Sequence, residues 1–359
     1  MKMERREFIG GMAAAAAFGA GPLRAAARPD EIRAVLLHLG FNMWCDWYPE
    51  GIDLAKVPAN SLPDRKLRCR DDLWRAATDR LVAKGMNMVV IDVGEGLVFP
   101  SHPELAIDGS WTAEKLSEEV RRLKALGIEA IPKLNFSTTH NGWLKHYRRM
   151  TSTPQYYRVC EDLLRDVFEI FGRPRFIHIG SDEEDGLWHV MGSTERRYVV
   201  VRRGEIWKFD FLHLVRTVEK LGARAWCWSD YGWMCPEFHD WCPKSVLMSN
   251  WFYDEDHRGF DLATNPSEQD RRILAQYEAL DKAGFDQVPC GTNWTSAKRA
   301  KLPEKGEDII GKLVDYSRKT ISPRRLKGFL MTSWVATDDE RHLATIIRGI
   351  DLLSDALKS

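Results

Sequence analysis

The chain has 359 residues, and its 52 basic and 52 acidic side chains give a formal net charge of zero. Without a basic stripe, the chain lacks the electrostatic footprint of a nucleic-acid-binding protein. Beyond residue 27, no apolar run approaches the roughly 20 residues that a transmembrane helix needs, so we expect no membrane association of the mature protein. The 14 tryptophans favour a different kind of partner, because ring-bearing ligands such as carbohydrates stack on flat aromatic faces in clefts.

The first 27 residues have the anatomy of an export signal. Arg5-Arg6 precedes an apolar stretch of small residues over positions 10–20, and Ala25-Ala26-Ala27 forms a small-residue cleavage site. The pattern resembles a twin-arginine signal, and its apolar stretch is too short to span a bilayer. We therefore expect residues 1–27 to be a signal peptide, residues 28–359 to be a single domain, and the mature protein to be periplasmic or extracellular.

Motifs for cofactors and metals are absent from the sequence. The seven cysteines include no C-x-x-C pair, and no H-x-H or H-E-x-x-H spacing occurs, so zinc-ribbon and metalloprotease patterns have no support. No G-x-G-x-x-G run follows an apolar segment, which removes the dinucleotide fingerprint. We expect no cofactor.

Short apolar segments rich in β-branched residues alternate with stretches of helical period along the rest of the chain. We expect strands at residues 34–39, 87–93, 129–135, 175–179, 223–229, 246–251, 287–293 and 328–334, and helices at 71–84, 112–126, 155–171, 205–221, 268–282, 306–319 and 339–357. This alternation predicts an α/β fold with a single (β/α)8 TIM barrel. An open doubly wound sheet is the alternative, but no linker rich in Pro, Gly or Ser divides the chain.

Polar and aromatic side chains recur where the predicted strands end. Barrel enzymes keep their chemistry at the C-terminal ends of their strands, whereas the barrel interior is normally apolar. A ring of tryptophans, amides and acids is poor core material, so we expect it to line a cleft. The predicted substrate-binding residues are Asp92, Asn135, His140, Trp228, Asp230, Trp251, Tyr253, Asn293, Trp294 and Trp334.

The fourth predicted strand has the most informative ending. From Phe176 to Asp185 it reads Phe-Ile-His-Ile-Gly-Ser-Asp-Glu-Glu-Asp, an apolar alternation that stops at four acidic residues. A buried barrel strand of this kind delivers Asp182 and Glu183 to the rim. The alternative interpretation is a turn or N-cap cluster, since Asp and Glu are common where helices begin.

The segment from His178 to Glu183 resembles the His-x-Gly-Gly-Asp-Glu motif of glycoside hydrolase family 20, the β-N-acetylhexosaminidases and their relatives. The resemblance implies a glycosidase in which Glu183 is the general acid and Asp182 holds the substrate's 2-acetamido group as that group attacks the anomeric carbon. Neighbouring carboxylates disfavour each other's ionisation, which suits these two roles. Residues 131–136 with His140 resemble the family's third strand, and Trp334 matches its eighth-strand tryptophan.

Several positions depart from the family pattern. Ser181 replaces a glycine of the motif, and Asn293-Trp294 stands where the family has an Asp and a Tyr. Ala336 stands where the family has a glutamate, and no arginine ends the first strand. These changes bear on N-acetyl specificity more than on the fold.

Other mechanisms and other classes of protein remain open at this point. A two-carboxylate retaining scheme, with an acid at the fourth strand and a nucleophile at the seventh, is disfavoured because no acid ends the seventh strand. An inverting scheme could use Glu183 as its acid and Asp230 or Asp92 as its base. Substrate assistance needs only Asp182 and Glu183 and ranks first. A non-catalytic carbohydrate-binding barrel is one alternative class. The other is a metal-dependent isomerase or hydrolase with ligands among His38, His140, His178, Asp182 and Asp230.

The export signal can be tested directly. Changing both Arg5 and Arg6 to lysine removes the twin-arginine pair while keeping the charge, so the precursor should accumulate in the cytoplasm. Cell fractionation followed by immunoblotting measures the distribution, with Arg24→Lys as the matched control. Normal export of the double variant would contradict the assignment.

Overall fold

The computed structural model describes residues 31–45, 53, 55, 62–184, 202–254, 258–293 and 309–359. The predicted signal peptide and the predicted site residue Trp294 lie outside these ranges. Within them, the search for membrane-spanning segments finds no helix with the length and hydropathy to cross a bilayer.

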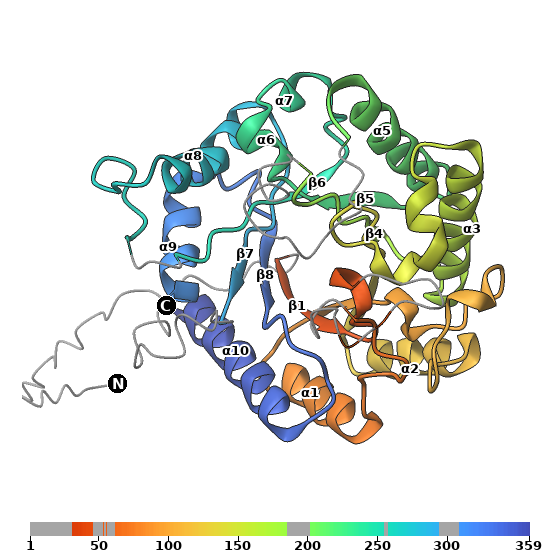
Figure 1. The fold of residues 1–359 in the computed structure, drawn as a ribbon. Coiled ribbons are helices and arrows are strands. Elements are labelled where there is room, and N and C mark those ends of the chain that lie inside the picture. Colours follow the sequence, from red (N-terminus) through yellow and green to blue (C-terminus); the bar gives the residue numbers. More distant parts are fainter. Residues whose placement is uncertain are drawn as a thin grey trace, which may run out of the picture.

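Eight parallel strands form one sheet that curls into a barrel (Figure 1). Pairing runs in the order β6-β5-β4-β3-β2-β1-β8-β7, and bridges from Met248 to Gln287 and from Trp251 to Cys290 link the two ends of the sheet. The predicted barrel is confirmed, because each expected segment contains a strand. The strands are β1 Ile32–His38, β2 Met88–Asp92, β3 Glu129–Lys133, β4 Phe176–His178, β5 Arg224–Trp228, β6 Leu247–Ser249, β7 Cys290–Thr292 and β8 Gly328–Thr332.

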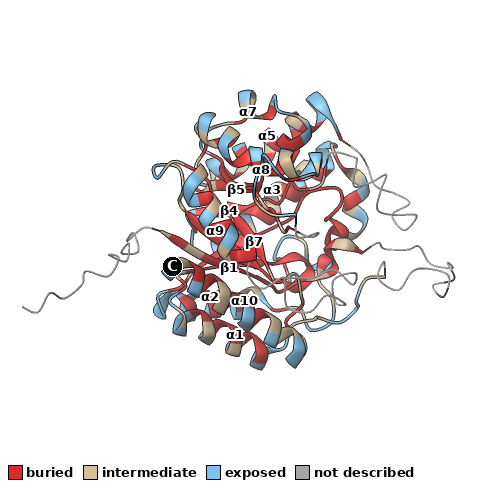
Figure 2. Ribbon diagram, turned by 90° about the vertical axis from the view of Figure 1, so that its left-hand side faces the viewer, coloured by how far each residue is buried: buried red, intermediate tan, exposed pale blue. Residues whose placement is uncertain are grey.

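Helices surround the barrel, and each predicted helix is present. Figure 2 shows the strands largely buried, while the surrounding helices alternate between buried and exposed positions. The long helices are α1 Asp71–Ala83, α2 Ala113–Ala125, α3 Pro154–Ile170, α5 Gly204–Lys220, α8 Glu268–Lys282, α9 Ile309–Thr320 and α10 Glu340–Lys358. Elements too short for a periodic signal are α6 Tyr231–Met234, α7 Phe238–Trp241, η1 Asn42–Trp44, η4 Gly94–Gly96, η5 Pro103–Leu105 and η6 Gly142–Met150.

Local signals in the sequence set the ends of the helices. At the start of α2, the Thr112 hydroxyl accepts the backbone N–H of Lys115 at 3.2 Å, which satisfies one of the free donors of the first turn. After the same helix, Gly127 adopts a φ of 79°, the left-handed conformation that ends helices and costs glycine little. This stop directs the chain from α2 back to the sheet.

The apolar core has two layers, one inside the barrel and one between the sheet and the helices. Alternate strand residues such as Leu36, Val90 and Ile131 fill the barrel interior. Their neighbours, such as Val35 and Val89, pack outward against the helices. Period-two alternation therefore sets which side chains point along the barrel axis.

One layer of the barrel interior is polar. His38, Asp92, Lys133 and His178 lie in register across β1 to β4, each two residues beyond an interior apolar position. The Lys133 ammonium donates to Asp92, and both side chains are almost completely buried. Burial and the nearby Lys133 charge lower the pKa of both histidines well below the ordinary value, so the histidines stay neutral.

The buried ion pair predicts a double-mutant result. Lys133→Met leaves the Asp92 carboxylate buried without its cation and should cost about 3–5 kcal/mol of unfolding free energy. Adding Asp92→Leu replaces the pair by apolar groups and should recover most of that loss. Urea unfolding measures both variants, and a single variant as stable as wild type would refute the expectation.

Candidate active site

The loop that follows β4 has left-handed backbone at three positions, one of which is the predicted acid Glu183. Gly180, Ser181 and Glu183 all have positive φ, at 70°, 70° and 55°. A Cβ on Gly180 would lie 2.0 Å from the Asn135 side-chain oxygen, so only glycine fits there. Non-glycine residues in this conformation persist where surrounding contacts fix them, and they cluster at functional sites.

Asp182 is held by residues that follow β3. Its Oδ1 accepts a hydrogen bond from Asn135 Nδ2 at 2.9 Å, and the side chain is 10% exposed. The Asn135 oxygen in turn accepts the Ser137 backbone N–H at 3.1 Å, which fixes the amide's orientation. The carboxylate of Asp182 is therefore preorganised by a chain of hydrogen bonds from the neighbouring strand.

Glu183 lies beside Asp182 and is more accessible, with 24% of its side chain exposed. His140 stands between the two acids: its Nδ1 is 3.7 Å from Asp182 Oδ2, and its Nε2 is 3.6 Å from Glu183 Oε2. The backbone N–H of Glu183 donates to Asp230 Oδ2 at 2.6 Å. The structure thus brings His140, Asp182 and Asp230 next to the predicted acid, and Asn135 joins the group through Asp182.

The acids from β2 and β5 are buried more deeply. Asp230 is 3% exposed, and burial first, then the charges of Asp182 and Glu183, raise its pKa well above the ordinary value. Burial also raises the pKa of Asp92, although Lys133 opposes that effect.

Glu184 follows Glu183 directly but is engaged in the protein interior. Its carboxylate accepts the backbone N–H of Thr138 at 3.0 Å and the Thr138 hydroxyl at 2.9 Å. Arg202 donates to Glu184 and also to Asp210 at 2.7 Å. This buried triad anchors the end of the β4 loop to α5, so the two adjacent glutamates differ in environment.

Aromatic rings cluster at the C-terminal ends of β5, β6 and β8. Trp334 Nε1 donates to the Tyr253 hydroxyl at 3.1 Å, and Tyr253 stacks on Trp251 with centroids 4.9 Å apart. Trp334 also contacts Trp228 at 6.0 Å. Trp228 is 1% exposed, whereas Trp251, Tyr253 and Trp334 are partly exposed. These three residues are the accessible part of the cluster.

Trp44 joins the aromatic cluster to the acids, although it was not among the predicted site residues. Its ring lies 6.2 Å from Trp334 and 5.9 Å from His140. Its position five residues after the end of the first predicted strand was the available signal. Glu95 supports this loop, because its Oε1 accepts the backbone N–H groups of Phe41 and Asn42 at 2.7 and 2.9 Å.

Asn293 has polar contacts away from the acid group. Its Nδ2 donates to the Thr345 carbonyl of α10 at 2.8 Å, and its oxygen accepts the Ser333 hydroxyl at 2.9 Å. The next residue, Trp294, is outside the described part of the chain. The substrate-binding roles of these two residues remain predictions.

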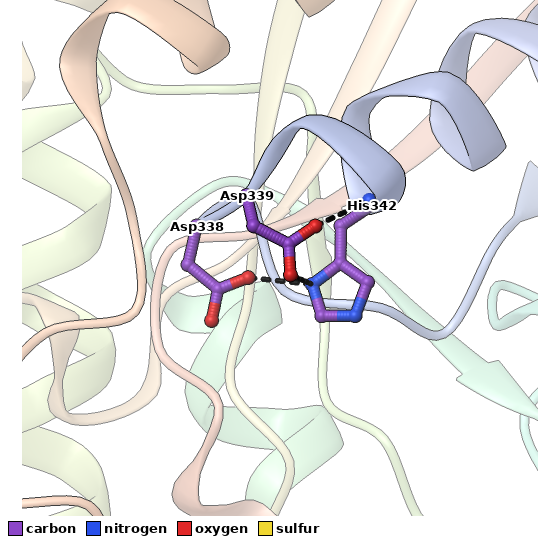
Figure 3. A group of neighbouring side chains, drawn as sticks. All are labelled: Asp338, Asp339 and His342. Atoms are coloured by element: carbon purple, nitrogen blue, oxygen red, sulfur yellow. Dashed lines mark hydrogen bonds and ion pairs between the residues drawn. The ribbon is translucent and has the colours of Figure 1, made fainter.

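Among the described residues, one group has ligand atoms close enough for a metal ion: Asp338, Asp339 and His342 (Figure 3). Asp339 caps α10 by accepting the backbone N–H groups of Arg341 and His342. Asp338 accepts Arg68 Nε at 2.6 Å and lies 2.5 Å from His342 Nδ1. Both carboxylates therefore have structural partners at the start of the helix. The group contains none of the ligands that the alternative metal-dependent class would use.

Acids and partly exposed aromatic rings at the C-terminal ends of parallel strands define a barrel with an enzyme-like rim. No protein-family model matches the sequence, and a comparison with curated proteins also gives no match. Solved structures do share the fold.

Three of these structures illustrate the likeness. An exo-β-N-acetylglucosaminidase of glycoside hydrolase family 20 from Vibrio harveyi, in complex with N-acetylglucosamine, has a TM-score of 0.58 and 13% identity, over 92% of this chain and 54% of its own. A β-N-acetylhexosaminidase from Bacteroides fragilis gives 0.56 and 12%, over 89% and 66%. Dispersin B gives 0.52 and 15%, over 80% and 95%. At these identities, the likeness establishes a shared barrel fold.

Glu95 gives the site a testable pH response. Burial raises the pKa of Glu95 to about 7, so its proton stabilises the fold at low pH and that contribution is lost as the pH rises from about 4.5 to about 7. Glu95→Gln keeps an acceptor for the Phe41 and Asn42 N–H groups but cannot ionise. Between pH 4 and 8, wild type should lose about 3 kcal/mol of unfolding free energy relative to the variant. Parallel pH profiles in urea unfolding would contradict this.

Proposed function

We propose that the protein is an exported glycoside hydrolase that cleaves a glycosidic bond with the substrate's own 2-acetamido group as nucleophile. Glu183 is the general acid and Asp182 is its partner. The observation that carries the proposal is the arrangement of the two acids around His140, with Asp182 fixed by Asn135 and Glu183 left accessible. The shared fold with hexosaminidases supports it.

The geometry suggests how the chemistry is divided between the two acids. The Glu183 carboxyl transfers its proton to the glycosidic oxygen as the bond to the anomeric carbon breaks. The acetamido oxygen forms a bond to that carbon, and the resulting oxazolinium cation is stabilised by the Asp182 carboxylate. Water then attacks the anomeric carbon, and the bond between that carbon and the acetamido oxygen breaks, which re-forms the acetamido group. The proton of the water passes to Glu183 and restores the acid.

Two features argue against the inverting alternative. Its base would have to activate a water molecule from Asp92 or Asp230. Asp92 is buried in an ion pair with Lys133. Asp230 Oδ2 is engaged by the Glu183 backbone. Substrate assistance needs neither Asp92 nor Asp230 as a base.

The aromatic cluster suggests a saccharide with an N-acetyl group as the substrate. The faces of Trp334, Tyr253 and Trp251 offer stacking surface next to the acids. The Vibrio harveyi enzyme was solved with N-acetylglucosamine, which makes terminal N-acetylglucosaminides the first compounds to test. Export through the predicted twin-arginine signal would bring the enzyme to extracytoplasmic saccharides.

Substitutions at the two acids test the proposal. Glu183→Gln keeps the shape but removes the transferable proton, so kcat on an unactivated N-acetylglucosamine disaccharide should fall by roughly 10²-fold or more. Aryl glycosides with good leaving groups need less protonation and should be affected less. Asp182→Asn should slow both substrate types, because it weakens the charge that stabilises the cationic transition state.

Glu118→Gln on the exposed face of α2 is the matched control and should behave as wild type. Aryl glycosides without the 2-acetamido group test the substrate assistance, since they lack the nucleophile. Unchanged disaccharide hydrolysis by Glu183→Gln would overturn the assignment of the acid. Equal turnover of both glycoside types would overturn the assisted mechanism.

A further inference from the structure

We propose that Asp230 is a positioning residue for Glu183, because its carboxylate fixes the left-handed backbone of Glu183 and thereby the direction in which the acid points. The inference rests on the proposed function and deepens it at the same site. Asp230 reaches Glu183 from the end of β5, a strand that pairs with β4.

The contact is short and specific. Asp230 Oδ2 accepts the Glu183 backbone N–H at 2.6 Å across 47 residues of sequence. The φ of Glu183 is 55°, which a residue with a side chain adopts only where its surroundings hold it there. A hydrogen bond from the strained residue's own N–H to a side chain that follows the neighbouring strand is a direct restraint of this kind.

Asp230 does not use its side chain in the way its position would suggest. It is the N-cap residue of α6, where an Asp carboxylate commonly accepts a backbone N–H of the first turn. Here the side chain makes no capping hydrogen bond. It turns instead to the β4 loop, so the hydrogen bond to Glu183 replaces the local one.

The chemical setting of Asp230 also fits a supporting role. The side chain is 3% exposed, and Oδ1 is buried without a hydrogen-bond partner among the described residues. The carboxylates of Asp182 and Glu183 add to burial in raising the pKa of Asp230. A change at Asp230 therefore affects Glu183 through the hydrogen bond to its backbone. It affects both Asp182 and Glu183 through their electrostatic interaction with Asp230.

Two substitutions separate the hydrogen bond from the charge. Asp230→Asn keeps an oxygen that can accept the Glu183 N–H, whereas Asp230→Ala removes the acceptor. On an unactivated N-acetylglucosamine disaccharide, the Ala variant should lose about 10²-fold in kcat with little change in KM, and the Asn variant should lose about 10-fold or less. The Ala variant should lose less activity on an aryl glycoside with a good leaving group. Equal losses on both substrates would overturn the proposal.

A double-mutant cycle tests whether Asp230 acts through Glu183. If it does, adding Asp230→Ala to Glu183→Gln should cause almost no further loss of kcat. The glutamine at position 183 has no proton to transfer, so its orientation no longer affects the rate. Additive losses would show that Asp230 acts separately and would overturn the proposal. Should the Ala variant fail to fold, Asp230→Leu replaces it as a variant of similar size to Asn without an acceptor.

A readout without substrate keeps this inference distinct from the proposed function. Hydrogen exchange at the Glu183 amide should be slow in wild type and in Asp230→Asn, and at least about 10-fold faster in Asp230→Ala or Asp230→Leu. Wild type that hydrolyses no glycoside but shows this exchange pattern would refute the function and leave the positioning role standing. Unchanged exchange in the Ala and Leu variants would refute the positioning role.

Discussion

The parallel register of β1 to β4 is the constraint on which the rest of the site depends. Because His38, Asp92, Lys133 and His178 stand at one level of the barrel, the residues that follow them leave the sheet together. A shift of one residue in any strand would turn its polar side chain into the outer apolar core. The ion pair between Asp92 and Lys133 opposes such a shift, since either partner alone would be a buried charge.

Residues from the ends of three neighbouring strands hold the strained turn that follows β4. Asn135 comes from the end of β3, Asp182 and Glu183 follow β4, and Asp230 follows β5. Each acid is therefore fixed by a different neighbour, which keeps one carboxylate closely bound and the other accessible. Packing of the helices against the outer face of the sheet keeps those strand ends in place.

The strands and helices were predictable because their signals are local. Alternating apolar residues, N-cap side chains such as that of Thr112 and helix-ending glycines such as Gly127 lie within a few residues of the elements they define. The grouping of Asp182 with Asn135 and His140 followed from the rule that parallel strands end at one rim.

Other properties of the site depend on contacts that the sequence does not display. Glu183 and Glu184 are adjacent and chemically alike, yet only Glu184 meets Thr138 and Arg202 in the interior. Asn293 follows β7 as predicted, but its amide is engaged by α10 and Ser333. Such differences arise from backbone direction and from partners far away in sequence, which periodicity does not encode.

The triad of Glu184, Arg202 and Asp210 has a consequence for how this protein could diversify. Glu184 and Arg202 bracket an interval of the chain and are joined to each other by a buried ion pair. Lengthening a closed loop adds little entropic cost once its ends are fixed. Insertions or exchanges between these two anchors should therefore leave the backbone of Asp182 and Glu183 in place, because the buried ion pair holds both ends of the interval. The chain that directly follows the two predicted acids can accordingly be exchanged without loss of the contacts that hold the turn before it.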